Sequence, residues 1–242
     1  MVFGRGSEEA LVLRAAGIDY EFLPGVSAAI ATPEAAGIPI TQRDHTPSVS
    51  LISGYEAYDK RGRAVGWEHM ARHGGTLVLM MSVRNCRRNA ERLVASGRDP
   101  ETPAALVRWG TRGIQQTVVG TLASIGERVE AAKLRPPAVM IVGSVVGLRD
   151  QIKWVESRPL FGKRIVTTRA FDQSQGLIAG LSQLGADVVP IPCLRIEPTH
   201  PEHLAQELAN LDRYNGILVS SPNAAESLVT AVMARGDLRV LA

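Results

Sequence analysis

The chain has 242 residues, of which 45% are hydrophobic and 21% charged, and its formal net charge is +3. These values exclude a wholly disordered or low-complexity chain and leave room for one or two globular domains. The sequence has no apolar run long enough for a membrane span, no signal-peptide pattern at its start and only two cysteines. With 5% aromatic residues and no basic–aromatic clusters, we expect a cytoplasmic protein with neither a nucleic-acid nor a membrane partner.

Helices and strands alternate along the first 155 residues. Capping residues, glycine stops and apolar spacing predict helices at 7–16, 26–36, 86–96 and 121–132. Apolar runs bounded by turn residues predict strands at 19–23, 48–54, 76–83, 103–109, 114–120 and 138–146. Neither 76–83 nor 138–146 contains a charged residue, which indicates strands that are buried on both faces.

A second α/β pattern follows a linker at 156–162, which contains Pro159 and Gly162. Strands are expected at 163–168, 187–191 and 216–220, and helices at 172–184, 202–211 and 223–234. Strands that alternate with helices of this length are typical of a doubly wound parallel sheet of the flavodoxin-like kind. We therefore expect two α/β domains, at 1–155 and 163–242.

Glycine-rich turns recur where predicted strands meet helices, as at Gly110-Thr111 and Gly143. Glycine lets the backbone approach a ligand, and a following helix offers free N–H groups. None of these turns forms a P-loop or the G-x-G-x-x-G dinucleotide fingerprint. Turn geometry is the simpler explanation of any one of them.

Other reactive side chains give weaker hypotheses. His69 and His73 are spaced to share a helix face, but the Glu of a zinc hydrolase motif is absent, so no metal is expected. Cys86 stands among arginines that would lower its pKa, although a small helix residue is the simpler interpretation. Two further sets are expected to be surface residues: His200 with His203, and Arg84, Arg87, Arg88 and Arg92.

An ordered series of motifs over residues 1–155 resembles the uroporphyrinogen-III C-methyltransferase family. The motifs are Val2-Phe-Gly-Arg-Gly6, Phe22-Leu-Pro-Gly-Val-Ser-Ala-Ala29, Ala36-Gly-Ile-Pro-Ile-Thr41, Thr76-Leu-Val-Leu-Met-Met81, Ala105-Leu-Val-Arg-Trp-Gly-Thr111 with Gln115 and Gln116, Val119-Gly-Thr-Leu122, Pro137-Ala-Val-Met-Ile-Val-Gly143 and Val145-Val-Gly-Leu-Arg149 with Trp154. Each motif alone is weak, whereas their order and spacing together are specific.

This resemblance implies methyl transfer from S-adenosylmethionine to uroporphyrinogen III, giving precorrin-2 for sirohaem and cobalamin synthesis. The family has two α/β domains with the cofactor between them, and it is usually a homodimer formed through the methylase. Carried over by position, the cofactor contacts fall at Val2, Ser27, Ala28, Met81 and Gly110. Arg5 and Arg43 are candidate partners of the substrate carboxylates.

The chain departs from the family pattern in its content as well as in single residues. Ser7 stands where glycine is usual, and Met80 and Ser82 replace the Tyr and Gly that flank the family's methionine. The Gly-Pro-Gly-Asp loop and the proposed acid/base residues of the family's first domain are not in this sequence, so catalytic residues are not assigned. We expect a fragment with impaired activity.

Residues 159–242 resemble a second family, uroporphyrinogen-III synthase. The residues that carry the likeness are Pro159-Leu-Phe-Gly-Lys-Arg-Ile-Val-Thr-Thr-Arg169, Leu184-Gly-Ala-Asp-Val-Val-Pro-Ile-Pro192, Ile196-Glu-Pro198 and Leu211-Asp-Arg-Tyr-Asn-Gly-Ile-Leu-Val-Ser-Ser-Pro-Asn223. The resemblance places Thr168, Arg169, Ser221 and Asn223 at turns that face the substrate. The two reactions are consecutive, which favours a bifunctional enzyme in which the synthase part is incomplete.

Two alternatives remain. Residues 1–155 could be a cofactor-binding or dimerisation module without catalysis. They could also belong to a methylase of a later corrin intermediate, against which the synthase-like segment argues.

Overall fold

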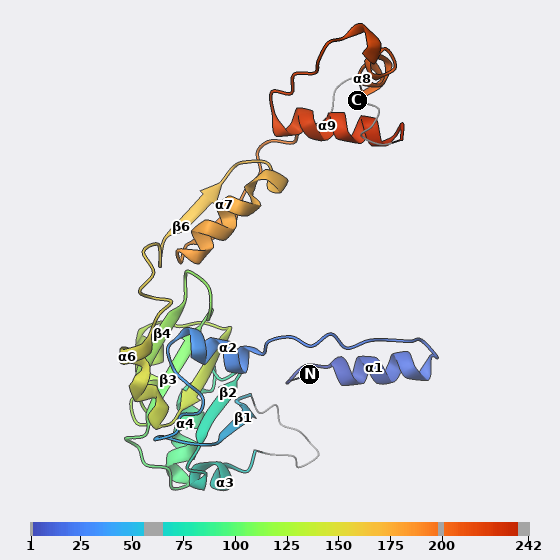
Figure 1. The fold of residues 1–242 in the computed structure, drawn as a ribbon. Coiled ribbons are helices and arrows are strands. Elements are labelled where there is room, and N and C mark those ends of the chain that lie inside the picture. The colour runs from blue at the N-terminus through green and yellow to red at the C-terminus, as the bar shows by residue number, and fades with distance from the viewer. Residues whose placement is uncertain (1, 56–64, 198–200, 237–242) are drawn as a thin grey trace. The chain divides into compact units, whose positions relative to one another are not determined.

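The computed structural model describes residues 2–55, 65–197 and 201–236. The chain divides into two compact units. Unit 1 contains residues 1–167 and 172–191, and unit 2 contains residues 168–171 and 192–242. Figure 1 shows the helices and strands of both units.

A mixed sheet of five strands is the centre of unit 1. Its strands are β1 (Val49–Ser53), β2 (Thr76–Met80), β3 (Pro103–Arg108), β4 (Gln116–Thr121) and β5 (Ala138–Val142). They lie in the order β1-β2-β5-β3-β4. β1 and β2 are parallel, whereas β5 is antiparallel to both of its neighbours, β2 and β3. β2 and β3 therefore run in the same direction, and their carboxyl ends meet at one edge of the sheet.

Helices cover both faces of this sheet. The helices of this part are α1 (Gly6–Ala15), α2 (Ala28–Ala35), α3 (Trp67–Arg72), α4 (Cys86–Ala95), α5 (Ile125–Ala131), the 3₁₀ helix η1 (Ser144–Leu148) and α6 (Arg149–Ile152). One face packs against α3, α4 and α5, and the other against α2 and η1.

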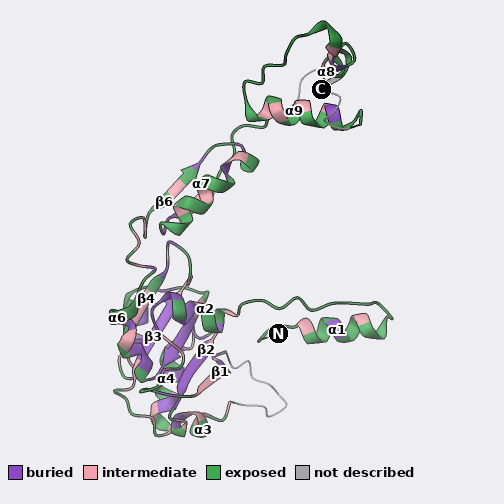
Figure 2. Ribbon diagram, in the orientation of Figure 1, coloured by how far each residue is buried: buried purple, intermediate pink, exposed green. Residues whose placement is uncertain are grey.

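The pleat of the strands divides their side chains between these two cores. Leu77 and Leu79 point to the α4 side, and Val78 between them points to the α2 side. β3 and β5 alternate in the same way, which explains their continuous apolar sequence. Figure 2 shows the buried residues concentrated in β2, β3 and β5. The prediction that 76–83 and 138–146 contain strands buried on both faces is confirmed.

The second α/β pattern begins with a parallel strand pair that belongs to unit 1. β6 (Arg164–Thr167) and β7 (Asp187–Pro190) are connected through α7 (Phe171–Gln183). Unit 2 contains α8 (Pro201–Leu208), the 3₁₀ helix η2 (Leu211–Arg213) and α9 (Pro222–Met233). The expected α/β class and the parallel pairing of the first two strands are confirmed.

Three sequence predictions of strands need correction. Residues 19–23 and 216–220 are extended but form no strand, and their apolar side chains are exposed: Leu23 to 83% and Leu218 to 96%. An apolar run forms a strand only where a neighbouring strand is present to pair with it. The strand predicted at 138–146 ends at Val142, because Gly143 turns the chain at φ +146° into η1.

Candidate functional site

The candidate site lies at the edge of the sheet where β2 and β3 end and β5 begins. Met80 pairs with Val139, and Arg108 pairs with the adjacent Ala138. The turns at Met81 and Gly110 therefore leave the sheet side by side, with only β5 between them. Two strand spacings separate them, or about 10 Å.

The first turn has a strained backbone at Met81. This residue has φ +57°, in the left-handed region that side chains other than glycine rarely adopt, and its side chain is 48% exposed. Buried polar contacts fix the chain on both sides of it. Gly54 N–H donates to the Met80 carbonyl at 2.7 Å, and Asn89 Nδ2 donates to the Gly54 carbonyl at 2.9 Å and to Ser82 Oγ at 3.0 Å. Strain maintained in this way is typical of functional sites.

The second turn, after β3, is strained at two positions. Trp109 has φ +50° and Thr111 has φ +73°. Gly110 between them lies directly against α2, since a Cβ at this position would be 2.7 Å from Thr32 Cγ2 and 2.8 Å from Thr32 Cα. A side chain there would displace either the turn or the helix. This close packing gives Gly110 a structural reason to be small, and its expected contact with the cofactor stays a prediction.

The N-terminus of α2 presents the other two expected cofactor residues. Ser27 caps the helix, because its Oγ accepts from Ala29 N–H at 3.2 Å. Ala28 is exposed, whereas Ala29 is fully buried against the sheet. The helix thus packs on the sheet while its first residue faces solvent, and helix N-termini favour anionic or polar ligand groups.

The remaining residues expected from the methyltransferase resemblance lie apart from this edge. Val2 and Arg5 precede α1, and Arg5 forms an ion pair at 2.6 Å with Glu8, three residues later in the chain. The hydrogen bonds described for residues 2–26 all stay within that segment. Arg43 is exposed in the loop before β1. The structure therefore brings Ser27, Ala28, Met81 and Gly110 to this edge of the sheet and does not bring the other three there. All seven stay predictions as cofactor or substrate contacts.

The residues expected from the synthase resemblance all lie in unit 2. The carbonyl of Thr168 accepts from Cys193 N–H at 3.0 Å, and Arg169 is exposed. Ser221 caps α9 by accepting from Ala224 N–H at 3.1 Å, and Asn223 is in the first turn of that helix. Capping is a sufficient structural reason for Ser221.

Cys86 is a buried residue of α4, which agrees with the simpler interpretation of it as a small helix residue. Burial raises its pKa to about 12, which outweighs the lowering by Arg87 that the sequence suggested. Its Sγ contacts Met140 Sδ at 4.0 Å inside the core. Of the four arginines nearby, Arg87 forms an exposed ion pair with Glu130 at 2.6 Å, as expected of a surface arginine.

Among the described histidines, His73 has a structural role at the end of a helix. His69 is in α3, and His73 ends it and accepts from Gly75 N–H through Nδ1. His203 lies 3.9 Å from Glu207, and His200 lies outside the described residues. Within residues 2–55, 65–197 and 201–236, no three His, Cys, Asp or Glu side chains are placed to hold a metal ion.

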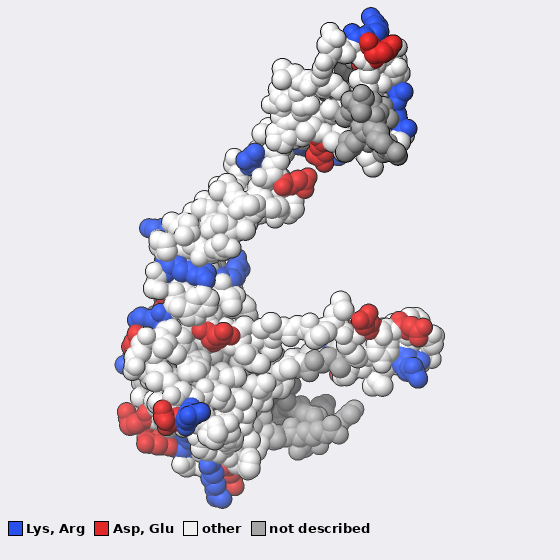
Figure 3. Space-filling model, viewed as in Figure 1, with Lys and Arg blue, Asp and Glu red and all other residues white. Residues whose placement is uncertain are grey.

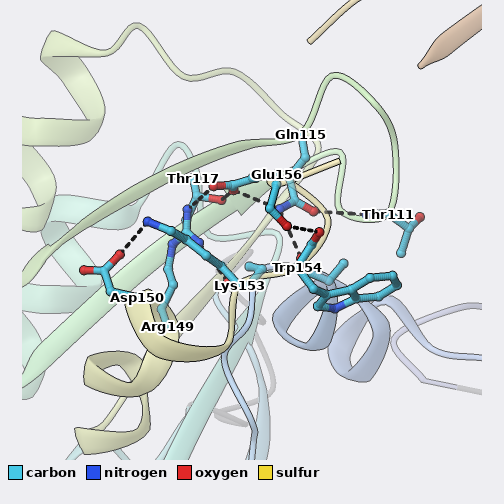
Figure 4. Close-up of polar contacts among 11 residues, drawn as sticks. Thr111, Gln115, Thr117, Arg149, Asp150, Lys153, Trp154 and Glu156 are labelled. Atoms are coloured by element: carbon cyan, nitrogen blue, oxygen red, sulfur yellow. Dashed lines mark hydrogen bonds and ion pairs between the residues drawn. The ribbon is translucent and has the colours of Figure 1, made fainter. Parts of the chain in front are cut away.

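A buried polar network beside the second turn was not predicted from the sequence (Figure 4). Gln115 is 5% exposed, and its Oε1 accepts from Thr111 N–H at 3.2 Å. Its Nε2 donates to the Ala35 carbonyl at 3.4 Å and to Glu156 Oε1 at 3.1 Å. Glu156 also pairs with Arg149 at 2.5 Å.

The electrostatics of Glu156 follow from these contacts. Burial by itself raises the pKa of a carboxyl group. Hydrogen bonds from Arg149, Gln115 and Thr117 outweigh burial and hold the pKa of Glu156 below its ordinary value of 4.5. Glu156 is therefore an ionised carboxylate at neutral pH. Its position within the segment expected to be a linker gave no signal of this role.

Two protein-family models match this chain. The family model for Tetrapyrrole (Corrin/Porphyrin) Methylases matches residues 1–126, which is more than half of the chain. The chain belongs to the tetrapyrrole methylase family. A second family model, Uroporphyrinogen-III synthase HemD, matches residues 175–242. The tetrapyrrole methylase part, which includes the β2 and β3 turns, is thus followed by a HemD part, as the sequence motifs predicted.

Curated relatives of this chain have names that agree with the two family models. An S-adenosyl-L-methionine-dependent uroporphyrinogen III methyltransferase of Methanosarcina barkeri is 47% identical over 149 residues, covering 62% of this chain and 58% of that protein. The porphyrin biosynthesis protein HemD of Ruminiclostridium josui is 33% identical, and the match covers 100% of this chain and 48% of that protein. The chain therefore spans only about half the length of the relatives it matches.

A solved structure shows the same fold. The uroporphyrin-III C-methyltransferase of Thermus thermophilus, crystallised with S-adenosyl homocysteine, has a TM-score of 0.52 and 33% identity. The match covers 61% of this chain and 63% of that chain.

The surface of the methylase part carries charges of both signs. The face drawn in Figure 3 is mostly neutral, and basic and acidic side chains are interspersed near its α3 end. None of the helices that the structure describes is long and apolar enough to cross a membrane.

Proposed function

We propose that this chain supplies one wall of the cofactor site of an S-adenosylmethionine-dependent methylase that methylates uroporphyrinogen III to precorrin-2. The observation that carries the proposal is the convergence of Met81, Gly110 and α2 at one sheet edge in a chain of this family. Precorrin-2 leads to sirohaem and cobalamin, and we expect a cytoplasmic homodimer formed through the methylase part, at residues 1–155.

The residues at this edge fit such a cofactor. Met81 presents an exposed thioether to pack against a flat ring, and the small Gly110 and Ala28 leave backbone groups open to polar atoms. S-adenosylmethionine supplies the methyl group from its sulfonium. The chain's own contribution is to bind and orient the cofactor, and Val2 is a further proposed contact. Arg5 and Arg43 are proposed partners for the carboxylates of the substrate.

Titration of the chain with S-adenosylhomocysteine in a calorimeter tests this function. We expect saturable binding that Gly110→Val abolishes, because the added side chain meets the backbone of α2. Gly74→Val is the matched control, since a Cβ at Gly74 meets nothing within 4 Å and Gly74 precedes β2, at the opposite edge of the sheet. Absence of binding by the unaltered chain contradicts the proposal. Binding without methyl transfer to uroporphyrinogen III favours the non-catalytic module instead.

A synthase-related role for residues 163–242, after a linker at 156–162, is proposed on the match to the HemD family. Thr168, Arg169, Ser221 and Asn223 are its expected substrate contacts, and all four lie in unit 2. Formation of uroporphyrinogen III from hydroxymethylbilane tests it. Unaltered activity after substitution of Arg169 and Asn223 contradicts the assignment of these contacts.

A further inference from the structure

The side chains of Gln115, Arg149 and Glu156 connect the two elements that form the proposed cofactor wall. Gln115 Oε1 holds Thr111 N–H in the strained turn after Gly110, and Gln115 Nε2 reaches the Ala35 carbonyl at the end of α2. A single buried amide therefore bridges the turn and the helix. Since Gln115 is 5% exposed, no water can easily replace it.

The carboxyl end of α2 is held by three side chains from outside the helix. The last carbonyl groups of a helix have no partner within it. Here Trp154 Nε1 donates to the Glu34 carbonyl at 3.2 Å, and Arg149 Nη1 donates to the Ala36 carbonyl at 3.0 Å. The third donor is the Gln115 amide, which donates to the Ala35 carbonyl. A cation at this end is also favoured by the helix dipole.

Glu156 holds these donors in place. Its two oxygens accept from Arg149 at 2.5 Å, from Gln115 at 3.1 Å and from Thr117 at 3.0 Å. The carboxylate thus orients both the guanidinium and the amide, which donate to carbonyl groups at the end of α2. Figure 4 shows the contacts of Glu156 with these side chains. Charge-assisted hydrogen bonds of this kind are directional and strong.

We propose that Gln115, Arg149 and Glu156 are positioning residues that set the spacing between α2 and the Gly110–Thr111 turn and thereby the affinity for the cofactor. The inference rests on the proposed function, because the cofactor must bind at this edge for the spacing to matter. The close approach of Gly110 to Thr32 on α2 makes the site sensitive to small shifts of the helix. None of the three residues needs to touch the cofactor.

The test compares Gln115→Met with Val142→Ala in the full chain. Met has nearly the length of Gln but no polar atom, so the turn and the helix lose their bridge. Val142 is fully buried on the opposite side of the sheet, at the end of β5 remote from the turns, so its truncation destabilises the fold without touching the network. Binding of S-adenosylhomocysteine and amide hydrogen exchange of residues 109–115 are measured for both variants.

We expect Gln115→Met to weaken binding by roughly tenfold, the factor that one or two lost hydrogen bonds correspond to. Exchange at Thr111 should accelerate, while Val142→Ala binds within about twofold of the unaltered chain. Equal affinity in Gln115→Met, or an equal loss in Val142→Ala, overturns the positioning role but leaves the proposed function standing. Failure of the unaltered chain to bind S-adenosylhomocysteine overturns the proposed function. If, in addition, amide exchange at Thr111 is unchanged in Gln115→Met, the positioning role is overturned as well.

Discussion

The turns after β2 and β3 leave the same edge of the sheet, but different kinds of contact hold them. The Met81 turn is held by neutral groups, which are the Gly54 backbone and the side chains of Asn89 and Ser82. The Thr111 turn depends on Gln115 and on an ion pair formed by Arg149 and Glu156. No charged side chain takes part in the contacts that hold the first turn. The second turn depends on the charged segment at residues 149–156, which follows the sheet.

This difference has a structural consequence for the two families that meet in this chain. The charged segment lies just before β6 in the chain, and it precedes residues 175–242, which the HemD family model matches. The contacts that hold the Thr111 turn therefore include Arg149 and Glu156, which lie outside the range 1–126 that the methylase family model matches. The following predictions test the contrast between the two turns.

Arg149→Met should have the largest effect. It leaves the Glu156 carboxylate without its cation and the Ala36 carbonyl without its donor, in a site where the Arg149 side chain is 11% exposed. We expect the free energy of unfolding to fall by about 2–4 kcal/mol. Urea denaturation followed by circular dichroism measures it. Lys153→Met, an exposed cation of the same segment, is the control, and an equal loss in both variants contradicts the account.

Asn89→Ala should have the next largest effect, on the Met81 turn. It removes the 2.9 Å and 3.0 Å hydrogen bonds to Gly54 and Ser82 in a buried site. We expect a loss of about 1–3 kcal/mol that does not depend on salt concentration, because no charge is involved. Denaturation at two salt concentrations measures this, with the exposed Arg88→Ala on the same helix as control. A strong salt dependence contradicts the contrast between the turns.

Glu156→Gln should change the pH dependence of stability. The pKa of Glu156 is lower in the folded chain than its ordinary value of 4.5, so the unfolded chain binds this proton more readily. The stabilisation is present above about pH 4.5 and is lost as the pH falls through the lower folded value. Unfolding curves between about pH 3 and pH 6 should show a smaller acid-induced loss in the variant.

Asp187 provides an internal reference for that experiment. Burial by itself raises the pKa of Asp187, but hydrogen bonds from Arg164 and Arg112 outweigh it and lower the pKa. The contribution of Asp187 to acid unfolding remains in Glu156→Gln. The free energy of unfolding should therefore still fall with pH in the variant, but less steeply. An identical pH profile in the variant and the unaltered chain contradicts the role given to Glu156.

Asp150→Asn should have the smallest effect. Asp150 pairs with Lys153 at 2.9 Å, but its side chain is 87% exposed and the pair touches neither turn. Exposed ion pairs contribute little to stability because water and salt screen them. We expect unchanged unfolding curves and unchanged cofactor binding. A clear loss of binding would show that the charges of this segment act together rather than through Glu156.

The strands β2, β3 and β5 could be predicted from the sequence because their apolar runs are buried on both faces. The run at 19–23 looks similar but has no neighbouring strand, and only tertiary structure supplies that information. Resemblance to the family's motifs predicted Met81 and Gly110 as contacts. The motifs contain Gln115 but gave it no role, and they contain neither Asn89 nor Glu156, because hydrogen bonds between residues distant in the chain leave no local pattern.

Chemical-shift mapping of S-adenosylhomocysteine on the amide spectrum of the chain tests the central claim most directly. The account predicts that the ligand shifts the amide signals of Ala28, Met81 and Gly110 and leaves Val142, at the opposite end of β5, unchanged. Shifts that avoid the carboxyl ends of β2 and β3, or no shifts at saturating ligand, would contradict it.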